Sequence, residues 1–148
     1  MGVLFISPFL IVLLGFVGGF LSSFFVADVP KIYWEFTVAD QQMVNRYDAV
    51  RRQRLDREID DVQMADRLEL EVLPAWRAAA DRFGGMKYVP ESEQPLVASV
   101  NEYIRLQREA LEDTVYALRV GDIEAMNKAN QKREAAARLA EKIDESQR

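Results

Sequence analysis

Hydrophobic and polar residues divide this chain into two parts that meet near residue 28. The first 27 residues carry no charged side chain, and Val3 to Val26 is a continuous run of apolar and small residues. As a helix, the 24 residues of this run would rise about 36 Å, which exceeds the hydrocarbon core of a bilayer at about 30 Å. All 19 basic and 24 acidic side chains follow the run. The pattern predicts a single transmembrane helix over residues 1–27.

Two other kinds of segment fit this run less well. A cleaved secretory signal begins with Lys or Arg and ends in small residues, whereas this chain starts without a charge and a cut after Ala27 would place Phe25 at a small-residue position. A buried core helix of this length usually keeps a polar face, and the run has none. We therefore expect the segment to be retained as a membrane anchor.

Small residues recur along one face of the predicted anchor. They form two overlapping series with a spacing of four, made of Gly15, Gly18, Gly19, Ser22 and Ser23. Such a face lets a second helix approach closely in lipid. The alternative is that glycine is simply common in membrane helices. We predict that these residues dock the anchor against another helix, from a second copy of the chain or from another membrane protein.

A short connector follows the anchor, over residues 28–36. Its candidate membrane-interface residues are Lys31, Tyr33, Trp34 and Phe36. Tyrosine and tryptophan favour the lipid headgroup zone because one end of the side chain is apolar and the other is polar. The alternative is that these aromatic side chains pack on a partner. The basic residues lie on the C-terminal side of the anchor, so the positive-inside rule favours a cytoplasmic domain.

Residues 37–148 have the pattern of an extramembrane helical domain. Its first predicted helix begins at Thr37, which together with Asp40 matches a capping box. Apolar residues then recur every three to four positions as far as Val72, as they do on the buried face of a helix. We predict one long helix whose membrane-proximal part, 37–58, extends past the other helices.

Proline and glycine mark the end of this long helix. Pro74 lacks a backbone donor, so we predict a kink or break near Leu73. The pair Gly84-Gly85 predicts the end of the helix, because glycine readily adopts the left-handed cap. After a loop, the next helix is expected to start near Ser92.

The last two predicted helices form an antiparallel hairpin. The first of them carries a stripe with a spacing of seven, made of Val97, Ile104, Leu111 and Leu118. Gly121-Asp122 predicts a tight turn into the final helix, 123–144, whose thin apolar face is mostly alanine. The predicted fold class is all-α: a transmembrane helix, a long proline-interrupted helix and a helical hairpin, which together make a three- or four-segment helical bundle.

The composition offers little for catalysis. The chain has no histidine and no cysteine, which removes the usual serine and cysteine triads, histidine-ligated zinc sites and di-iron bundles. Its many carboxylates have arginines at helical spacing, as on solvated helix surfaces. The net charge of −5 gives no basic footprint for nucleic acid. We therefore expect no enzyme activity, no cofactor, no metal site and no nucleic-acid partner.

Five residues of the domain are candidate contacts for a protein partner. They are Arg51, Arg52, Arg54, Trp76 and Tyr88. The arginines would suit an acidic partner or anionic lipid headgroups, although acidic residues follow them at once, as on an ordinary charged helix surface. The two aromatic residues either pack at the end of the bundle or anchor a partner.

Together these features indicate a protein that acts by binding. We expect a non-catalytic accessory or scaffolding subunit of a larger membrane complex, with membrane lipids, other membrane protein subunits or a second copy of the chain (a homo-oligomer) as partners. The alternative is a membrane-anchored sensory or ligand-binding helical bundle. In outline the plan resembles the sensor modules of bacterial chemoreceptors, which are bounded by a second membrane span that is missing here. A pocket between the helices would favour the alternative, and a continuous exposed apolar strip would favour the subunit.

Overall fold

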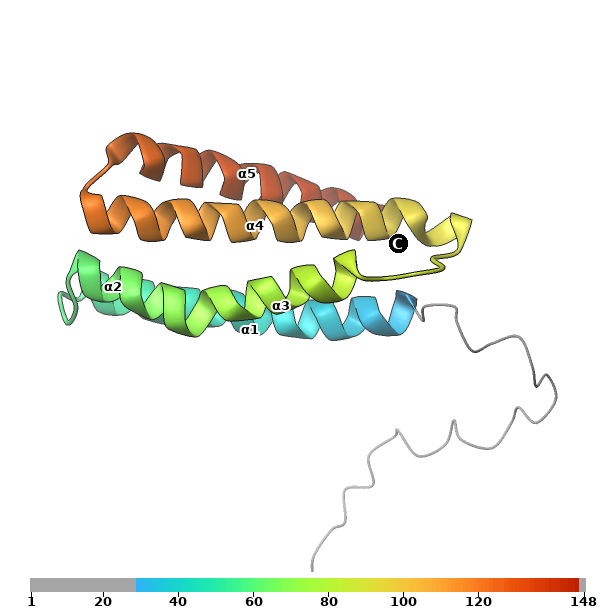
Figure 1. The fold of residues 1–148 in the computed structure, drawn as a ribbon, viewed down its shortest axis with the longest axis horizontal. Coiled ribbons are helices and arrows are strands. Elements are labelled where there is room, and N and C mark those ends of the chain that lie inside the picture. The colour runs from blue at the N-terminus through green and yellow to red at the C-terminus, as the bar shows by residue number, and fades with distance from the viewer. Residues whose placement is uncertain (1–28, 147–148) are drawn as a thin grey trace, which may run out of the picture.

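The computed structural model describes residues 29–146, which form a bundle of four helical arms (Figure 1). Three arms are single α-helices, and the other joins two α-helices through a π-helix. The elements are α1 (Val29–Leu55), α2 (Asp61–Arg67), the π-helix η2 (Leu68–Val72), α3 (Leu73–Gly84), the 3₁₀ turn η3 (Glu91–Glu93), α4 (Gln94–Val120) and α5 (Ile123–Ser146). No strand occurs in this part of the chain. The prediction of an all-α helical bundle is confirmed.

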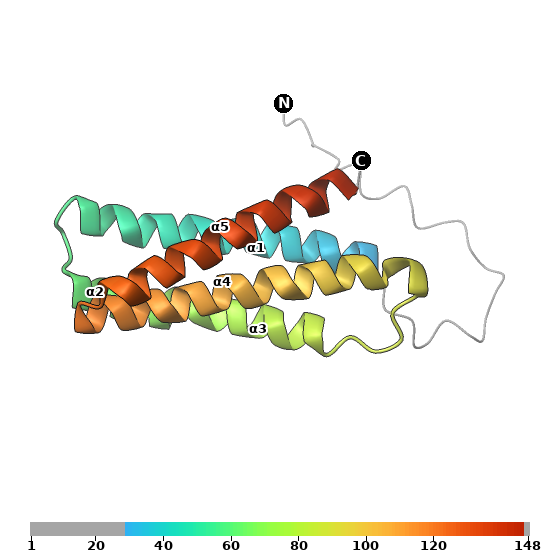
Figure 2. The same cartoon turned by 90° about the horizontal axis from the view of Figure 1, so that it is seen from above.

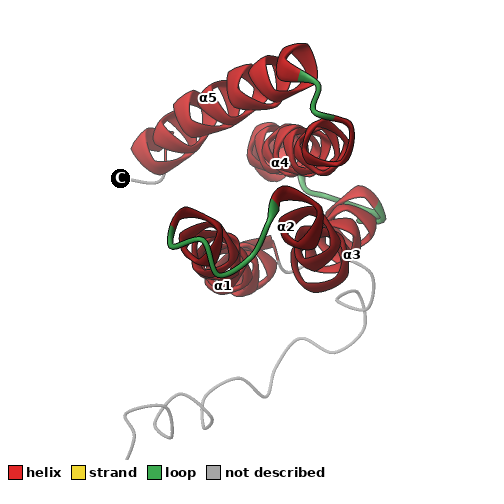
Figure 3. Cartoon of the chain, turned by 90° about the vertical axis from the view of Figure 1, so that its left-hand side faces the viewer, coloured by secondary structure: helices red, strands yellow, loops and turns green. Residues whose placement is uncertain are grey.

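Each arm runs antiparallel to the arm that precedes it in the chain. In Figure 1, α1 lies beside the arm made of α2, η2 and α3, and α4 and α5 form a hairpin above them. Figure 3 shows the four arms end-on, with α4 between α5 and the lower pair. Figure 2 shows α5 crossing α4 at an angle. The C-terminal part of α5 therefore reaches α1, where Ile143 and Tyr33 line the same small cavity.

Buried residues recur every seven positions along three of the helices. On α1 the buried residues are Val29, Phe36, Met43 and Val50. On α5 they are Ala129, Ala136 and Ile143. On α4 the predicted stripe is confirmed, since Val97, Ile104 and Leu111 are buried and Leu118 packs against the core. A spacing of seven keeps one face of each helix toward its neighbours in the bundle.

The prediction of one long helix from Thr37 to Phe83 is wrong, because the chain turns back over residues 56–60. The first arm begins at Val29, and Thr37 lies inside it. The Thr37 hydroxyl donates to the carbonyl of Tyr33 at 3.0 Å, as hydroxyls do within a helix, and caps nothing. The predicted overhang is also absent, because α1 buries side chains along its whole length.

The observed capping box lies at the start of α2. The Asp60 carboxylate accepts from the backbone N–H of Gln63 at 2.8 Å, and the Gln63 side chain accepts from the backbone N–H of Asp60 at 3.0 Å. In the turn before it, Arg57 has a φ of 61°, a left-handed conformation that costs a non-glycine residue about 1–2 kcal/mol. The capping box, at about 1 kcal/mol, and the burial of Met64 and Ala65 behind it offset that strain.

Pro74 does not break the second arm. It occupies the first turn of α3, directly after the π-helix Leu68–Val72. The N–H of Leu73 donates to the carbonyl of Leu68, five residues back. This wider turn accommodates the proline ring, which would clash with the carbonyl four residues before it in a regular α-helix. The break predicted near Leu73 is thus a π-bulge in a continuous arm.

The predicted turn at Gly121-Asp122 is confirmed. Gly121 has a φ of 71° and donates its N–H to the carbonyl of Ala117 at 2.8 Å. Asp122 then caps α5, because its carboxylate accepts from the backbone N–H of Ala125 at 3.0 Å. Glycine allows the left-handed conformation that ends α4 within so short a connection.

The helix α3 ends at the glycine pair Gly84-Gly85, as predicted, but Gly85 does not have the predicted left-handed conformation. The helix ends at Gly84, whereas Gly85 has a φ of −84°, so the predicted left-handed cap is wrong there. Gly85 is needed because no side chain fits at this position. A Cβ added to it would lie 2.8 Å from the carbonyl oxygen of Asp81, closer than carbon and oxygen atoms approach without displacement.

The predicted transmembrane helix, residues 1–27, lies outside the described residues. The same is true of its small-residue face, Gly15, Gly18, Gly19, Ser22 and Ser23. Within residues 29–146, no helix has the length and apolar character needed to cross a membrane. Residues 29–36 of the predicted connector form the first turns of α1.

Candidate ligand-binding pocket

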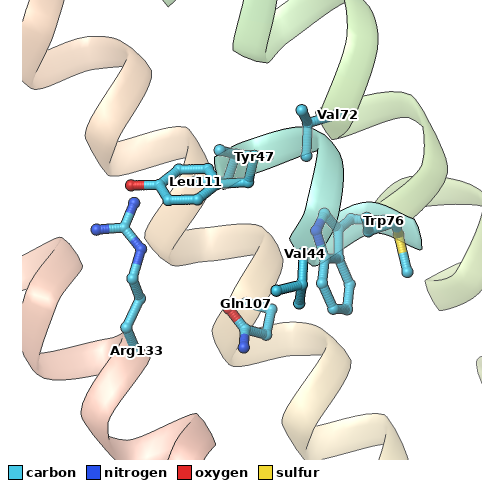
Figure 4. Close-up of a pocket in the computed structure, with 8 residues that line it drawn as sticks. Val44, Tyr47, Val72, Trp76, Gln107, Leu111 and Arg133 are labelled. Carbon is cyan, nitrogen blue, oxygen red and sulfur yellow. The ribbon is translucent and has the colours of Figure 1, made fainter. Parts of the chain in front are cut away.

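All four arms of the bundle contribute to one small cavity (Figure 4). Its volume is about 160 Å³. The lining residues are Met43, Val44 and Tyr47 from α1, Val72 from η2, Trp76 from α3, Gln107 and Leu111 from α4, and Arg133 from α5. Because every arm contributes, the cavity exists only in the assembled bundle.

Buried apolar side chains form much of its wall. Trp76 is 4 % exposed, and Val72 and Leu111 are also buried. The Trp76 ring lies 5.9 Å from the ring of Tyr103, centroid to centroid, at an interplanar angle of 59°. Aromatic contacts of this kind fix the ring in the core. The sequence left two roles open for Trp76, packing in the bundle or anchoring a partner, and in the structure it is a core residue that lines the cavity.

Arg133 is the charged residue of the lining. Its guanidinium carbon lies 4.9 Å from the centroid of the Tyr47 ring, within the range of a cation–π interaction. Figure 4 shows the guanidinium directed toward Tyr47. Its nitrogens donate to the Thr114 hydroxyl at 2.5 Å and to the Asn130 side-chain oxygen at 3.1 Å. Both partners are neutral, and Arg133 forms no ion pair with any carboxylate among residues 29–146.

Gln107 connects the cavity to a hydrogen-bond chain in the core. Its Nε2 donates to the Tyr103 hydroxyl at 3.2 Å, and that hydroxyl donates to Oδ1 of Asp40 at 2.9 Å. Burial raises the pKa of Asp40, and the hydrogen bond from Tyr103 opposes the change. Burial also raises the pKa of Tyr103, with the neighbouring Asp40 charge adding to it. Tyr103 therefore stays protonated at neutral pH and acts as a donor to Asp40.

The π-helix ends at the cavity. Its last residue, Val72, lines the cavity, and so does Trp76 in the turn that follows. One extra residue in a helical turn rotates everything after it by about 100° relative to a regular α-helix. The π-helix thus decides which face of α3 meets the cavity. Single π-helical turns are frequently found at functional sites.

Other hollows in the bundle are built differently. The largest of them, about 420 Å³, lies between the start of α4 and the end of α5. Its lining comes from these two ends and from η3, and no aromatic side chain takes part. A second, of about 270 Å³, lies between α1 and α3 and has an ion pair between Glu35 and Arg82 at its edge. The cavity around Arg133 alone among these three combines aromatic walls from several arms with a cation that lacks a counter-charge.

The predicted membrane-interface residues do not share one environment. Trp34 is 67 % exposed and Lys31 is also exposed, whereas Tyr33 is partly buried. Phe36 is only 8 % exposed, and its ring meets that of Phe83 edge-on at 5.0 Å. Phe36 is therefore a core residue and its assignment to the membrane interface is corrected.

The other predicted partner contacts lie at opposite ends of the bundle. Arg51 and Arg52 are exposed on the last turns of α1. Arg54 is paired with Asp61 at 2.5 Å across the turn to α2, so this arginine has a role within the fold. Tyr88 is 70 % exposed in the loop between α3 and α4.

The sequence prediction missed Gln107 and Arg133 as candidate site residues. A signal was present for both. Arg133 lies between Ala129 and Ala136 at helical spacing, and Gln107 lies four residues before Leu111, so each polar residue falls within an apolar stripe. A long polar side chain on a buried face requires partners or space around it, and here both lie beside the cavity.

No metal site accompanies the cavity in the part of the chain that the structure describes, since no group of three or more Asp, Glu, His or Cys side chains is placed to hold an ion. The polar chemistry available there is that of Arg133, Gln107 and the Tyr47 hydroxyl. No family model matches the chain, and comparison with curated proteins and with solved structures found no match to either.

Proposed function

We propose that the protein is a membrane-anchored helical bundle that binds a small ligand between its helices. The observation that carries this proposal is the cavity to which all four arms contribute. Apolar cavities with a few placed polar groups are the usual form of ligand sites, and helical bundles build them from facing helices. The overhanging helix that favoured an accessory subunit is absent, so the ligand-binding alternative is the better supported of the two.

The connection between the cavity and the proposed anchor supports a sensory role. The first arm begins at Val29, and only Ala27 and Asp28 separate it from the uncharged run Val3 to Val26 in the sequence. The same helix contributes Met43, Val44 and Tyr47 to the cavity. A ligand that shifts α1 would therefore act on the helix that follows the anchor. We propose a cytoplasmic location for this bundle.

Ligand binding is tested with the full-length chain in detergent micelles. Thermal unfolding is followed in the presence of a panel of small apolar and acidic compounds. A ligand at about 100 times its Kd should raise the unfolding temperature by roughly 5–10 °C. Val44→Phe should abolish the shift, because the ring fills the cavity. Val38→Phe, on the exposed face of the same helix, is the matched control and should respond like the wild type. A panel without any hit, or an unchanged response in Val44→Phe, would count against the cavity as a ligand site.

The membrane anchor is tested separately. Alkaline carbonate washing should leave the protein in the membrane pellet, and release into the supernatant would contradict the anchor. The absence of cysteine makes location measurable by labelling. Asn127→Cys places a single thiol at an exposed position of α5. A membrane-impermeant maleimide should label it only after cell lysis if the bundle is cytoplasmic.

An accessory-subunit role remains the second candidate, because one end of the bundle is unusually apolar. Its large exposed apolar side chains are Leu55, Val62, Val120 and Ile123. They lie where α1, α2, α4 and α5 end or begin, opposite to Val29 (Figure 1). The exposed Arg51 and Arg52 lie on the adjoining turns of α1. Exposed acidic residues, among them Asp56, Glu58 and Glu124, lie at the same end. An exposed apolar area bordered by charges of both signs suits another protein subunit.

Co-purification in mild detergent distinguishes the two roles. Leu55→Ser combined with Ile123→Ser should release any bound subunit and leave the cavity intact, because both side chains are exposed at that end. Val44→Phe should fill the cavity and leave any bound subunit in place. If the serine variant keeps every co-purifying subunit, this end of the bundle is not a docking surface.

A further inference from the structure

We infer that the cavity takes a small monocarboxylate with a compact apolar body, such as an aromatic acid. This inference rests on the proposed function, because it names the class of ligand for the same cavity. Three features carry it: a partly buried arginine without a counter-charge, an apolar wall across from it, and a volume close to that of one ring.

The arginine differs from most others in the bundle. Arg108 is also partly buried without an ion pair among the described residues, but it does not line this cavity. Seven arginines of the described residues form ion pairs with carboxylates, namely Arg54, Arg67, Arg77, Arg82, Arg105, Arg119 and Arg138. Arg133 is partly buried and has only the neutral Thr114 and Asn130 as hydrogen-bond partners. A cation removed from water without a counter-charge is unfavourable. A ligand carboxylate would supply the missing charge, and guanidinium N–H groups not engaged by these two partners would bind it.

The acidic side chains on the facing surface of α4 do not supply that charge. Asp113 and Glu109 both pair with Lys132, with Nζ to oxygen distances of 2.8 Å and 3.3 Å. Glu109 also pairs with Arg105 at 2.8 Å. Each of the two carboxylates therefore has a cation within ion-pair distance, and neither forms an ion pair with Arg133. Their pairing also weakens their repulsion of an incoming anion.

The guanidinium is held in place before any ligand arrives. The Tyr47 ring lies against it, and the bonds to Thr114 and Asn130 fix it from the α4 and α5 sides. Figure 4 shows Arg133 on one side of the cavity and Trp76 on the other. A ligand would therefore be oriented with its carboxylate at Arg133 and its apolar body toward Trp76. Such preorganisation reduces the entropy lost on binding.

The size and charge of the cavity limit the ligand further. An engineered apolar cavity of about 150 Å³ holds a benzene ring, and this one measures about 160 Å³. Its wall carries Trp76, Leu111 and Val72, none of which can pair with a second charge. We therefore expect a monocarboxylate to bind and a dicarboxylate to be rejected, because the second carboxylate would be buried against apolar side chains.

The test compares three probes of related shape on the full-length chain in detergent micelles at neutral pH. Benzoate carries the inferred charge, toluene carries none and terephthalate carries two, the second of which lies across the ring from the first and would face the apolar wall. Affinity is measured by isothermal titration calorimetry, and thermal unfolding is followed in parallel. We expect benzoate to bind most tightly and terephthalate to show no binding.

Variants of the arginine isolate the charge. Arg133→Met keeps a long apolar stem and should weaken benzoate binding by about tenfold or more, while toluene binds as well as before. Arg138→Met, an exposed arginine of the same helix, is the matched control and should leave benzoate affinity unchanged. Arg133→Lys keeps the charge and should retain part of the affinity, which keeps the test valid if the methionine variant does not fold.

The outcomes separate this inference from the proposed function. Equal binding of toluene and benzoate, or benzoate binding that Arg133→Met leaves unchanged, overturns the carboxylate class while ligand binding in the cavity stands. Binding of neither benzoate nor toluene to the wild-type chain also overturns it. If the wider panel then gives no shift either, the proposed function falls as well.

Discussion

The Tyr103 hydroxyl on α4 donates a hydrogen bond of 2.9 Å to the Asp40 carboxylate on α1. The same tyrosine ring lies 6.1 Å from the ring of Phe36 and 5.9 Å from that of Trp76. One side chain thus joins the first arm to the third by a polar contact and fills the aromatic core with its ring. It also ties the cavity to this core, because its hydroxyl accepts from Gln107.

Removing this hydroxyl should lower the stability of the bundle. Tyr103→Phe keeps the ring but leaves the partly buried Asp40 without its donor, and hydrogen bonds to charged groups contribute about 1.5–3 kcal/mol. We expect the free energy of unfolding to fall by that amount in urea titrations followed by circular dichroism. Tyr116→Phe, on an exposed face of the same helix, should change it by less than about 0.5 kcal/mol. A loss that small in Tyr103→Phe would show that the bond contributes little.

The raised pKa of Asp40 makes stability depend on pH. In the folded state, burial raises the pKa of Asp40 above 3.8, the usual value for an aspartate. Between the unfolded and the folded pKa the folded state binds more protons at Asp40, so the contribution of this group to stability is greatest below this window and falls as pH rises through it. Asp40→Asn keeps an acceptor for Tyr103 and removes the titration. In urea titrations from about pH 4 upwards, the stability of the variant relative to the wild type should rise with pH, and at neutral pH the variant should have at least wild-type stability. A less stable asparagine variant at neutral pH would contradict this account.

Two leucines of the π-helix provide a matched pair for core packing. Leu68 is fully buried at 0 % exposure, whereas Leu70 is 75 % exposed. Leu68→Ala should lower the free energy of unfolding by about 2–5 kcal/mol, because it leaves a cavity in the core. Leu70→Ala should stay within about 0.5 kcal/mol of the wild type. Similar losses of unfolding free energy for both variants would mean that the π-helix does not turn Leu68 toward the core and Leu70 toward solvent.

The bundle should fold without the first 28 residues, provided that the whole of α1 is kept. A fragment 29–148 retains Val29 and Phe36, both of which are buried. A fragment 37–148 lacks them, and removing a buried phenylalanine side chain alone costs about 3–5 kcal/mol. Thermal unfolding followed by circular dichroism should therefore show a clearly lower midpoint for the shorter fragment. Equal midpoints would show that the first turns of α1 add nothing to the core.

The small-residue face of the proposed anchor is tested by Gly19→Leu. The leucine side chain would occupy the space that a neighbouring helix backbone needs. We expect the variant to insert into the membrane as the wild type does but to lose dimers or co-purifying subunits in mild detergent. Leu13→Ile changes a bulky residue of the same run without adding volume and serves as the control. Unchanged assembly in Gly19→Leu would indicate that this face contacts lipid.

The local sequence pattern was sufficient to predict the α4–α5 hairpin. The stripe of Val97, Ile104 and Leu111 defines one buried face, and Gly121-Asp122 can only form a tight turn between two helices. These features depend on neighbours within a few residues in the chain. Their outcome is therefore fixed by helical periodicity and by the conformational freedom of glycine.

The turn before α2 shows where local pattern fails. Asp60 and Gln63 form the observed capping box, but Thr37 and Asp40 offer a similar match in the sequence. Apolar spacing also continues through the turn. A cap contributes only about 1 kcal/mol, whereas packing α2 against α4 buries whole side chains such as Met64. Long-range burial therefore decided between two equivalent local signals.

By itself the sequence determined that the charged part of the chain is all-α, that α4 and α5 fold back on each other, and that an uncharged run precedes this part. Only the tertiary structure decided that Tyr47, Trp76, Gln107 and Arg133 surround one cavity. Periodicity identifies the buried face of each helix but not the faces that meet, because this depends on crossing angles between arms. It depends as well on the rotation that the π-helix adds before α3, which Pro74 allows and the sequence pattern does not reveal.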